Sequence, residues 1–413
     1  MFKFKGRRLF SILLTLVFVI SFTAGCANGG NTTPTSTESQ APAAPKVIKI
    51  GMVTSKTGAL QAYGEQTIRG FEMGLDYYTK GTNKIGDTEI QFIVEDSETK
   101  PEVAKQKAVK LFEEDKIDII VGCASSSDAL AIVPLAEEYQ KVMVVEPAVA
   151  DAITGTAWNK YIFRTGRNSS QDAAAAAAAI GKKGAKLGIF APDSAFGHGG
   201  ADAFKLAAAN LGAEIVFEAY PPAESTDFTA QIQQMIAAKP EAVYVVWAGA
   251  NSPWKAFMDL KVQEKGIKLS TGAPDIAALK TMWDNIGMDG FCVYYHGLPN
   301  NEVNDWMVKT AKEKYNTVPD LFDAGGFASA MAILTALEKS QGSTDAEKLI
   351  ATMEGMSFET PKGTMTFRKE DHQALQVIYS IKLEKKDGFD YPVPVLVREL
   401  SPEETAPPIT NNK

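Results

Sequence analysis

The stretch of sequence that decides the fold is VIKIGMVTSKTGALQAYG, residues 47–64. Residues 47–53 are mostly apolar and β-branched, which is typical of a strand covered on both faces of a parallel sheet. A turn follows at Gly58, and a segment of helical period begins near Tyr63 and extends to Thr79. This stretch therefore predicts a strand, a loop and a helix, the first part of a unit that ends in a parallel strand.

The same alternation of strand and helix continues beyond residue 64 in two series. Candidate strands of the first series cover residues 89–95, 117–121 and 142–146. Those of the second series cover residues 186–191, 213–219, 242–247 and 267–271. The last hundred residues mix helices with strand-like stretches, as expected for a tail that returns to both halves. The pattern predicts an α/β fold with two parallel sheets, each covered by helices.

The first 45 residues predict targeting and not folded structure. Four Lys and Arg residues precede an apolar run at 9–22, as in a secretory signal, and this run is shorter than the ~20 residues that span a membrane. Thr23-Ala24-Gly25-Cys26 resembles the bacterial lipobox, whose Cys is lipidated and becomes the first residue. We expect a lipoprotein signal peptide at 1–25 and a flexible tether at 26–45. The alternative is an ordinary signal peptide with an incidental Cys.

Composition and charge exclude several classes of protein. The chain has 413 residues, 45% of them hydrophobic and 22% charged, as in an ordinary globular protein of two or three domains. The formal net charge is -8. The first 25 residues hold four of the 42 Lys and Arg residues and no acid, so the rest of the chain is more acidic still. A nucleic-acid partner is therefore not expected, because it requires clustered cations.

The sequence lacks the residue patterns that catalysis commonly needs. It has three His residues, far apart in sequence, and no HExxH, GxSxG, GxxxxGK[ST] or GxGxxG motif. We therefore predict that the protein is not an enzyme and has no metal and no cofactor. One alternative stays open, a secreted hydrolase that uses a serine of the run Ser125-Ser126-Ser127.

The serine run also fits a binding site. It follows the candidate strand 117–121 and opens a helix, whose first N–H groups have no partner within the helix. Hydroxyl groups and a positive helix end at the carboxyl edge of a sheet suit a carboxylate. Ser126 and Ser127 are therefore candidate ligand residues, and the simpler interpretation of each is a helix N-cap.

Short motifs occur in a fixed order along the chain, none of them decisive alone. They are TSKTG and AYG (54–58, 62–64), GCASSS (122–127), PLAEE (134–138), VEPA (145–148), FRT (163–165), AFG (195–197), and GTMTFR with DHQ (363–373). In this order the chain resembles the leucine/isoleucine/valine-binding protein family, the solute receptors of ABC importers, over about residues 46–395.

The resemblance implies the type I periplasmic-binding fold. Two Rossmann-like lobes with parallel sheets would be joined by three hinge crossings, and the ligand would lie in the cleft between the lobes. The crossings are expected near Thr165, Leu298 and Lys362. The first lobe would then be residues 46–165 with 299–362, and the second residues 166–298 with 363–413.

The resemblance also implies which residues bind the ligand. They are Tyr63, Ser126, Ser127, Ala148, Ala150, Phe196, Trp247, Asp275 and Phe322. Ser126 and the backbone of Ala148 and Ala150 would bind a carboxylate, and Asp275 would pair with an ammonium group. Trp247 and Phe322 have an equally good explanation as core residues. Ala150 replaces the usual hydroxyl residue and Asp275 the usual Glu, so strict branched-chain specificity is not implied.

The sequence thus predicts a monomeric, lipid-anchored protein that captures an amino acid, branched-chain or of another shape, or a related small carboxylate. Its partners would be this solute and an ABC permease complex, and its only membrane contact the anchor at Cys26. It would be located at the outer face of the cytoplasmic membrane or in the periplasm. A sensory receptor of the same fold is the alternative within this class, and the serine hydrolase is the alternative from another class.

Overall fold

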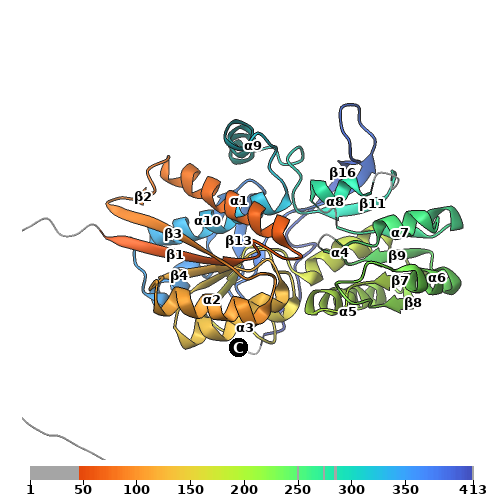
Figure 1. Ribbon diagram of the computed structural model, residues 1–413, viewed down its shortest axis with the longest axis horizontal. Helices are drawn as coiled ribbons and strands as arrows, with labels where there is room; N and C mark the ends of the chain where they lie inside the picture. The colour runs from red at the N-terminus through yellow and green to blue at the C-terminus, as the bar shows by residue number, and fades with distance from the viewer. Residues whose placement is uncertain (1–45, 249–250, 273–274, 283–285, 412–413) are drawn as a thin grey trace, which may run out of the picture. The chain divides into compact units, whose positions relative to one another are not determined.

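The computed structural model describes residues 46–248, 251–272, 275–282 and 286–411. The expected signal peptide, the tether and Cys26 lie outside the described residues. Contacts group residues 45–413 into one unit, in which two lobes are each built around a parallel sheet (Figure 1). The α/β fold with two lobes, predicted from the sequence, is confirmed.

The sheet of the first lobe has six strands in the order β2-β3-β1-β4-β5-β6. All neighbours are parallel except β2, which pairs antiparallel with β3. The bounds are Val47–Thr54 for β1, Lys84–Ile85 for β2, Thr88–Asp96 for β3, Ile119–Gly122 for β4, Met143–Val145 for β5 and Ile162–Arg164 for β6. Strands β4, β5 and β6 are buried throughout, as expected from their mostly apolar sequences.

Helices cover both faces of this sheet (Figure 1). On one face lie α1 (Gln61–Thr79) and α10 (Leu321–Lys339), and on the other α2 (Pro101–Glu113) and α3 (Ser126–Glu138). Helix α10 is long and apolar enough to cross a membrane. Because 89% of its most apolar stretch is buried inside the protein, we interpret it as a core helix. A Cβ at Gly326 would lie 2.0 Å from the carbonyl oxygen of Thr67, so α1 and α10 approach each other closely at glycine.

The second lobe contains a four-stranded parallel sheet in the order β10-β9-β7-β8. Its strands are β7 (Lys186–Phe190), β8 (Glu214–Ala219), β9 (Ala242–Val245) and β10 (Lys268–Ser270). Its helices are α4 (Ser169–Ile180), α5 (Ala195–Asn210), α6 (Thr229–Ala238), α7 (Trp254–Asp259) and α8 (Ile276–Lys280). The alanine-rich α4 packs against α5 and β11, where small side chains permit close contact.

Two small antiparallel sheets complete the fold. One has the order β11-β15-β16 and the other β12-β13-β14. The strands are β11 (Asp289–Cys292), β12 (Ser357–Thr360), β13 (Gly363–Phe367), β14 (Ala374–Leu375), β15 (Ile378–Glu384) and β16 (Val393–Leu400). The remaining helices are α9 (Glu302–Tyr315) and α11 (Ala346–Met353), and the 3-10 turns are η1 (Asp151–Ile153) and η2 (Gln263–Lys265).

We propose that the chain passes between the lobes after β6, after β11 and after β14, because at each of these points the next strand belongs to a different sheet. The first two of these points are close to Thr165 and Leu298, where the sequence predicts crossings. The expected third passage near Lys362 lies in the turn between β12 and β13, which pair with each other. We therefore propose that the third crossing is at residues 376–377, between β14 and β15.

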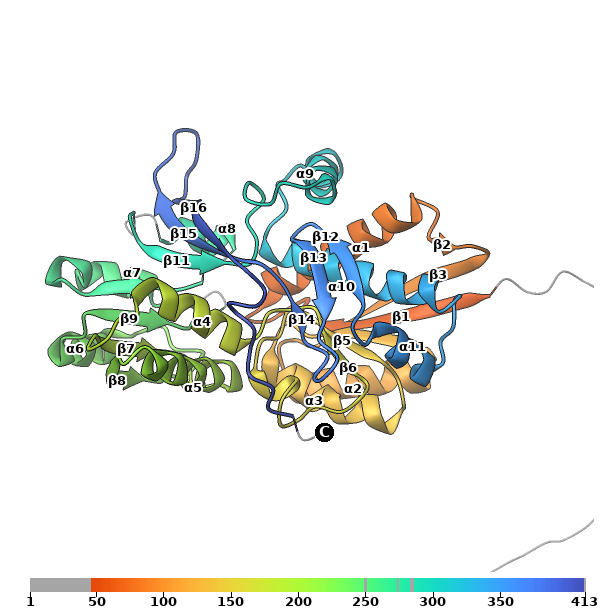
Figure 2. The ribbon, with the colours of Figure 1, turned by 180° about the vertical axis from the view of Figure 1, so that it is seen from behind.

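The C-terminal tail returns to the first lobe (Figure 2). Arg368 donates a hydrogen bond from Nη1 to the carbonyl of Pro407 at 2.8 Å. Asn411 donates from Nδ2 to the carbonyl of Glu370 at 2.7 Å. We propose a division in which residues 401–411 belong to the first lobe, although the sequence suggested the second lobe for all of 363–413.

Candidate functional site

The serine run connects two loops at the carboxyl edge of the first sheet. Ser125 is the N-cap of α3, and its Oγ accepts a hydrogen bond from the N–H of Asp128 at 3.3 Å. Ser126 is buried, and its Oγ accepts hydrogen bonds from the N–H groups of Val149 and Ala150 at 3.2 and 3.1 Å. The start of α3 is thereby fixed against the loop that follows β5.

The backbone donors expected for a ligand are used within the protein. The N–H of Ala148 donates to the carbonyl of Cys123 at 3.1 Å, and that of Ala150 donates to Ser126. Ser127 is half-buried, and its hydroxyl forms no hydrogen bond within the described part of the chain. Because Ser127 is the second residue of α3, its N–H has no partner inside the helix. Ser127 is therefore the donor of this loop that is most available to a ligand.

A cavity of about 410 Å³ lies in front of the serine run, and residues of both lobes line it. This volume falls in the range of ~300 to 1,000 Å³ that is usual for small-molecule sites. The cavity brings together six of the nine residues expected from the sequence: Tyr63, Ser126, Ser127, Ala148, Phe196 and Phe322. Ala150 does not line it, because this residue lies behind Ser126 with 3% of its surface exposed.

Aromatic rings form part of the cavity wall. Tyr63 of α1 and Phe322 at the start of α10 have ring centroids 4.0 Å apart, with an angle of 31° between their planes. Gln66 supports this pair, because its Oε1 accepts the N–H of Phe322 at 3.2 Å. Phe196, at the start of α5, lines the cavity from the second lobe. The cavity thus has aromatic walls contributed by both lobes.

Arg167 is a cavity residue that sequence reasoning missed. It lies in the first crossing, between β6 and α4, and its Nε is 3.1 Å from Oδ1 of Asp172. Burial opposes the charged form of Arg167, but the carboxylates of Asp172 and Glu146 favour it, so the pKa of Arg167 lies above its ordinary value. The only available signal was a cation two residues after the FRT motif, at the point where the chain crosses between lobes.

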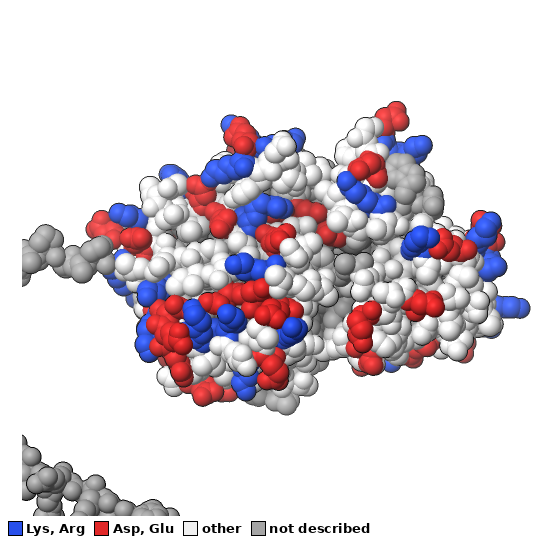
Figure 3. Space-filling model, in the orientation of Figure 1, with Lys and Arg blue, Asp and Glu red and all other residues white. Residues whose placement is uncertain are grey.

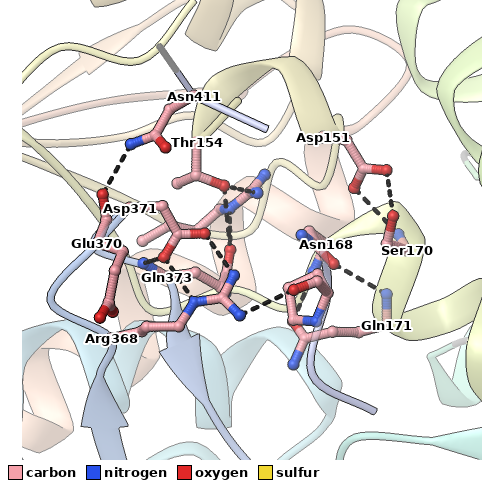
Figure 4. A network of polar contacts seen from close by, with 12 residues as sticks. Asp151, Thr154, Asn168, Ser170, Gln171, Arg368, Glu370, Asp371, Gln373 and Asn411 are labelled. Atoms are coloured by element: carbon pink, nitrogen blue, oxygen red, sulfur yellow. Dashed lines mark hydrogen bonds and ion pairs between the residues drawn. The ribbon is translucent and has the colours of Figure 1, made fainter. Parts of the chain in front are cut away.

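Polar contacts fix the residues that follow Arg167 at the start of α4 (Figure 4). Asn168 caps α4 by accepting the N–H of Gln171 at 2.9 Å, and the Gln171 side chain accepts the N–H of Asn168 at 3.0 Å. Ser170 donates its N–H and its hydroxyl to the Asp151 carboxylate, at 3.0 and 2.6 Å. The guanidinium therefore extends from a backbone that is held from both lobes.

Asp275, the expected partner of an ammonium group, lies elsewhere. Its Oδ1 accepts the N–H of Ala278 at 3.2 Å, so it caps α8, and 3% of its surface is exposed. It lines a neighbouring hollow together with Glu65 and Ser252, and burial raises its pKa above the ordinary value. Tyr63 lines both spaces. The structure thus does not bring Asp275 together with Ser126.

Trp247 also does not line the cavity. Its Nε1 donates to the carbonyl of Asn251 at 2.6 Å, and its ring packs edge-on against Phe228 with centroids 5.2 Å apart. Ala248 and Asn251, on either side of this bond, do line the cavity. Trp247 therefore holds Asn251 in place as part of the wall.

Among the described residues that line this cavity, none is a His that could activate a serine. His198 Nε2 lies 2.7 Å from Asp193 Oδ1, and His372 Nδ1 lies 2.9 Å from the carbonyl oxygen of Ile162. Neither His lines the cavity. Among the residues that the structure describes, no group of three His, Cys, Asp or Glu side chains could hold a metal ion.

Surface charges of both signs are interspersed on the face shown in Figure 3. On α2, for example, Lys107 and Lys110 each approach Glu95 to 2.8 Å, and Lys110 also pairs with Asp115. Cations paired in this way produce little positive field for a phosphate backbone.

The chain is similar to proteins of known family. A family described as periplasmic binding protein matches residues 47–388. The Leu/Ile/Val-binding protein homolog 6 of Brucella abortus (strain 2308) is 24% identical over 359 residues, which cover 84% of this chain and 90% of that protein.

Two solved structures extend the comparison. One, of an ABC-type branched-chain amino acid transporter from Rhodopseudomonas palustris CGA009, shares 47% sequence identity, with a TM-score of 0.79 over 89% of this chain and 100% of that chain. The other is a solute binding protein of an ABC transporter from Rhodopseudomonas palustris BisB5, in complex with 3,4-dihydroxy benzoic acid. It shares 28% identity, with a TM-score of 0.77 over 86% of this chain and 97% of that chain.

Proposed function

Because this chain belongs to the periplasmic binding proteins, in the leucine/isoleucine/valine-binding protein family, we propose that it captures a small carboxylated solute and delivers it to the permease of an ABC importer. One relative is named for branched-chain amino acids, and another was solved with a dihydroxybenzoic acid. The group that these solutes share is a carboxylate, so a carboxylate is the ligand feature we propose.

One observation carries this proposal: donors from both lobes line a single cavity of about 410 Å³. Ser127 contributes a hydroxyl and a helix N–H from the first lobe, and Arg167 contributes a guanidinium from the crossing. A carboxylate between them would receive hydrogen bonds from uncharged and charged donors. Because the lobes share the ligand, its binding would stabilise one arrangement of the lobes, the form that a permease could recognise.

We further propose that Cys26 carries the membrane anchor and that the module works outside the cytoplasmic membrane. The support is the order of the N-terminal sequence, in which basic residues, an apolar run and a small-residue motif precede Cys26. The Gly, Ser, Thr and Pro residues that follow would serve as a leash between membrane and module.

A thermal-shift screen of amino acids and simple carboxylates tests the proposed function. A ligand at 100 times its dissociation constant stabilises the folded protein by about 2.7 kcal/mol, which a melting curve resolves easily. We expect at least one carboxylate to raise the melting temperature, and the Ser127→Ala variant to respond less at the same concentration. If no carboxylate shifts the curve, or if the protein hydrolyses a chromogenic ester, the proposal is wrong.

A further inference from the structure

The charge balance of the cavity decides which carboxylates fit. Among the described residues that line it, one is basic, Arg167, and one is acidic, Glu224. Glu224 is exposed on the loop after β8, so water screens its charge. The Arg167 side chain is 17% exposed, so the charge of Arg167 acts more strongly on a ligand.

Arg167 has donors left for a ligand. Its ion pair with Asp172 uses Nε, and within the described part of the chain its side chain forms no other hydrogen bond. A guanidinium has five N–H donors in a planar fork, so the two terminal nitrogens can bind both oxygens of a carboxylate. The hydrogen bond from Nε to Asp172 orients the plane of the guanidinium group.

An ammonium group has no comparable partner. Asp275 already accepts the N–H of Ala278 as the cap of α8, and it lines the neighbouring hollow. Tyr63 and Ala59 line both spaces, so they stand between Asp275 and the serine run. Among the described residues that line the cavity, only the exposed Glu224 is acidic, so an α-ammonium beside the ligand carboxylate would lose its water without gaining a buried acidic partner.

The walls favour a flat apolar body. The Tyr63 and Phe322 rings lie 4.0 Å apart on one side, and Phe196 faces the cavity from the second lobe. Leu60 and Pro192 add further apolar surface. Aromatic walls of this kind bind a planar ring through stacking and edge contacts.

We propose that the solute is an aromatic monocarboxylate without an ammonium group, and that the Arg167 guanidinium pairs with its carboxylate. This inference rests on the proposed function and narrows the class of solute that the cavity binds. The sequence instead predicted an amino acid whose ammonium group pairs with Asp275.

Calorimetry with matched ligands tests the inference on the full-length protein. L-phenylalanine and 3-phenylpropanoate differ only in the ammonium group, and benzoate lacks both this group and the linker. We expect 3-phenylpropanoate or benzoate to bind at least tenfold more tightly than L-phenylalanine. If L-phenylalanine or L-leucine binds as tightly as these acids, the inference is wrong and the proposed function stands. If no carboxylate binds, both are wrong.

Variants separate the role of Arg167 in binding from its role in folding. Arg167→Lys keeps the charge but loses the fork, and we expect the affinity for the aromatic acid to fall at least tenfold. A single change of Arg167 to Gln would leave the Asp172 carboxylate without its ion-pair partner. The double variant Arg167→Gln with Asp172→Asn removes both charges and provides a folded control, verified by its melting curve. We expect this double variant to lose binding. Affinity that is unchanged in both variants would overturn the assignment of Arg167.

Discussion

The carboxylate of Asp320, in the first lobe, accepts a hydrogen bond from the backbone N–H of Ile276, in the second lobe, at 2.8 Å. The same carboxylate caps α10 by accepting the N–H of Leu321, also at 2.8 Å. Asp323, in the next turn, forms a two-pronged ion pair with Arg69 of α1. One half-buried carboxylate, that of Asp320, thus links the start of α10 to the start of α8 in the other lobe.

Asp320 should make stability depend on pH. Burial raises its pKa to about 7, and the neighbouring charges of Asp275 and Asp323 act in the same direction. Since the folded form then holds the proton more tightly than the unfolded form, this group stabilises the fold fully below about pH 4, and the contribution is lost as the pH rises toward 7. We expect Asp320→Asn, which cannot ionise and still accepts hydrogen bonds, to flatten the melting temperature between pH 4.5 and 8.

The control for this prediction is Asp345→Asn. Asp345 caps α11 by accepting the N–H of Lys348 at 2.9 Å, and it is exposed. Asn caps a helix about as well as Asp, so we expect this variant to keep the pH profile of the parent protein. If Asp320→Asn also keeps that profile, ionisation of Asp320 does not contribute to it.

We expect substitution of Ser126 to lower mainly stability and substitution of Ser127 to lower mainly ligand affinity. Ser126→Ala removes the acceptor of two buried N–H groups, those of Val149 and Ala150, so we expect a loss of roughly 1 to 3 kcal/mol of folding free energy. Ser127→Ala removes a hydroxyl without a partner in the described residues, so we expect unchanged urea denaturation and affinity lower by about tenfold. Equal effects of the two substitutions on stability would contradict this division of roles.

Much of the fold could be predicted because its signals are local. The strand expected at 117–121 is observed at Ile119–Gly122, and the helix expected from near Tyr63 to Thr79 is observed at Gln61–Thr79. Apolar runs bounded by turn residues determine such elements regardless of what packs on them. The third crossing is different, since the pairing of β13 with β12 depends on a partner that the local sequence does not reveal.

In the candidate site, too, some residues could be predicted from the sequence and others could not. Tyr63, Ser126 and Phe196 follow motifs whose order along the chain implied their place, and they line one cavity. Asp275 belongs to none of these motifs, and it caps α8 and does not line this cavity. Arg167 could not be predicted from a motif, because it pairs with Asp172 across the start of α4, and neither strand nor helix periodicity indicates such a pair.

Gly326 should tolerate no side chain. A Cβ at this position of α10 would lie 2.0 Å from the carbonyl oxygen of Thr67 in α1, and backbone cannot move aside easily. We expect Gly326→Ala to lower the free energy of unfolding by about 1 to 3 kcal/mol in urea denaturation. The matched control is Gly199→Ala in α5, where the nearest atom is 3.8 Å away. Alanine is the better helix former there, so a neutral or slightly stabilising effect is expected.

Cys26 should determine where the protein is found. Replacing it with Ser removes the only residue of the lipobox that can be lipidated, and the tether that follows has almost no apolar residues to hold the membrane. We expect Cys26→Ser to move the protein from the membrane fraction to the soluble fraction after cell lysis. Mass spectrometry of the N-terminal peptide provides the second readout. A variant that stays in the membrane would show that Cys26 is not the anchor.

Asp275 should behave as a helix cap and not as a ligand residue. Its Oδ1 accepts the N–H of Ala278, and the cavity that Ser126 lines does not include it. Asn caps about as well as Asp but cannot neutralise an ammonium group, so we expect Asp275→Asn to leave the affinity for the best ligand unchanged. Asp275→Ala should cost about 1 kcal/mol of stability with little effect on affinity. Loss of a desolvated charge pair would instead weaken binding by ~2 to 5 kcal/mol, so calorimetry on Asp275→Asn distinguishes the two roles.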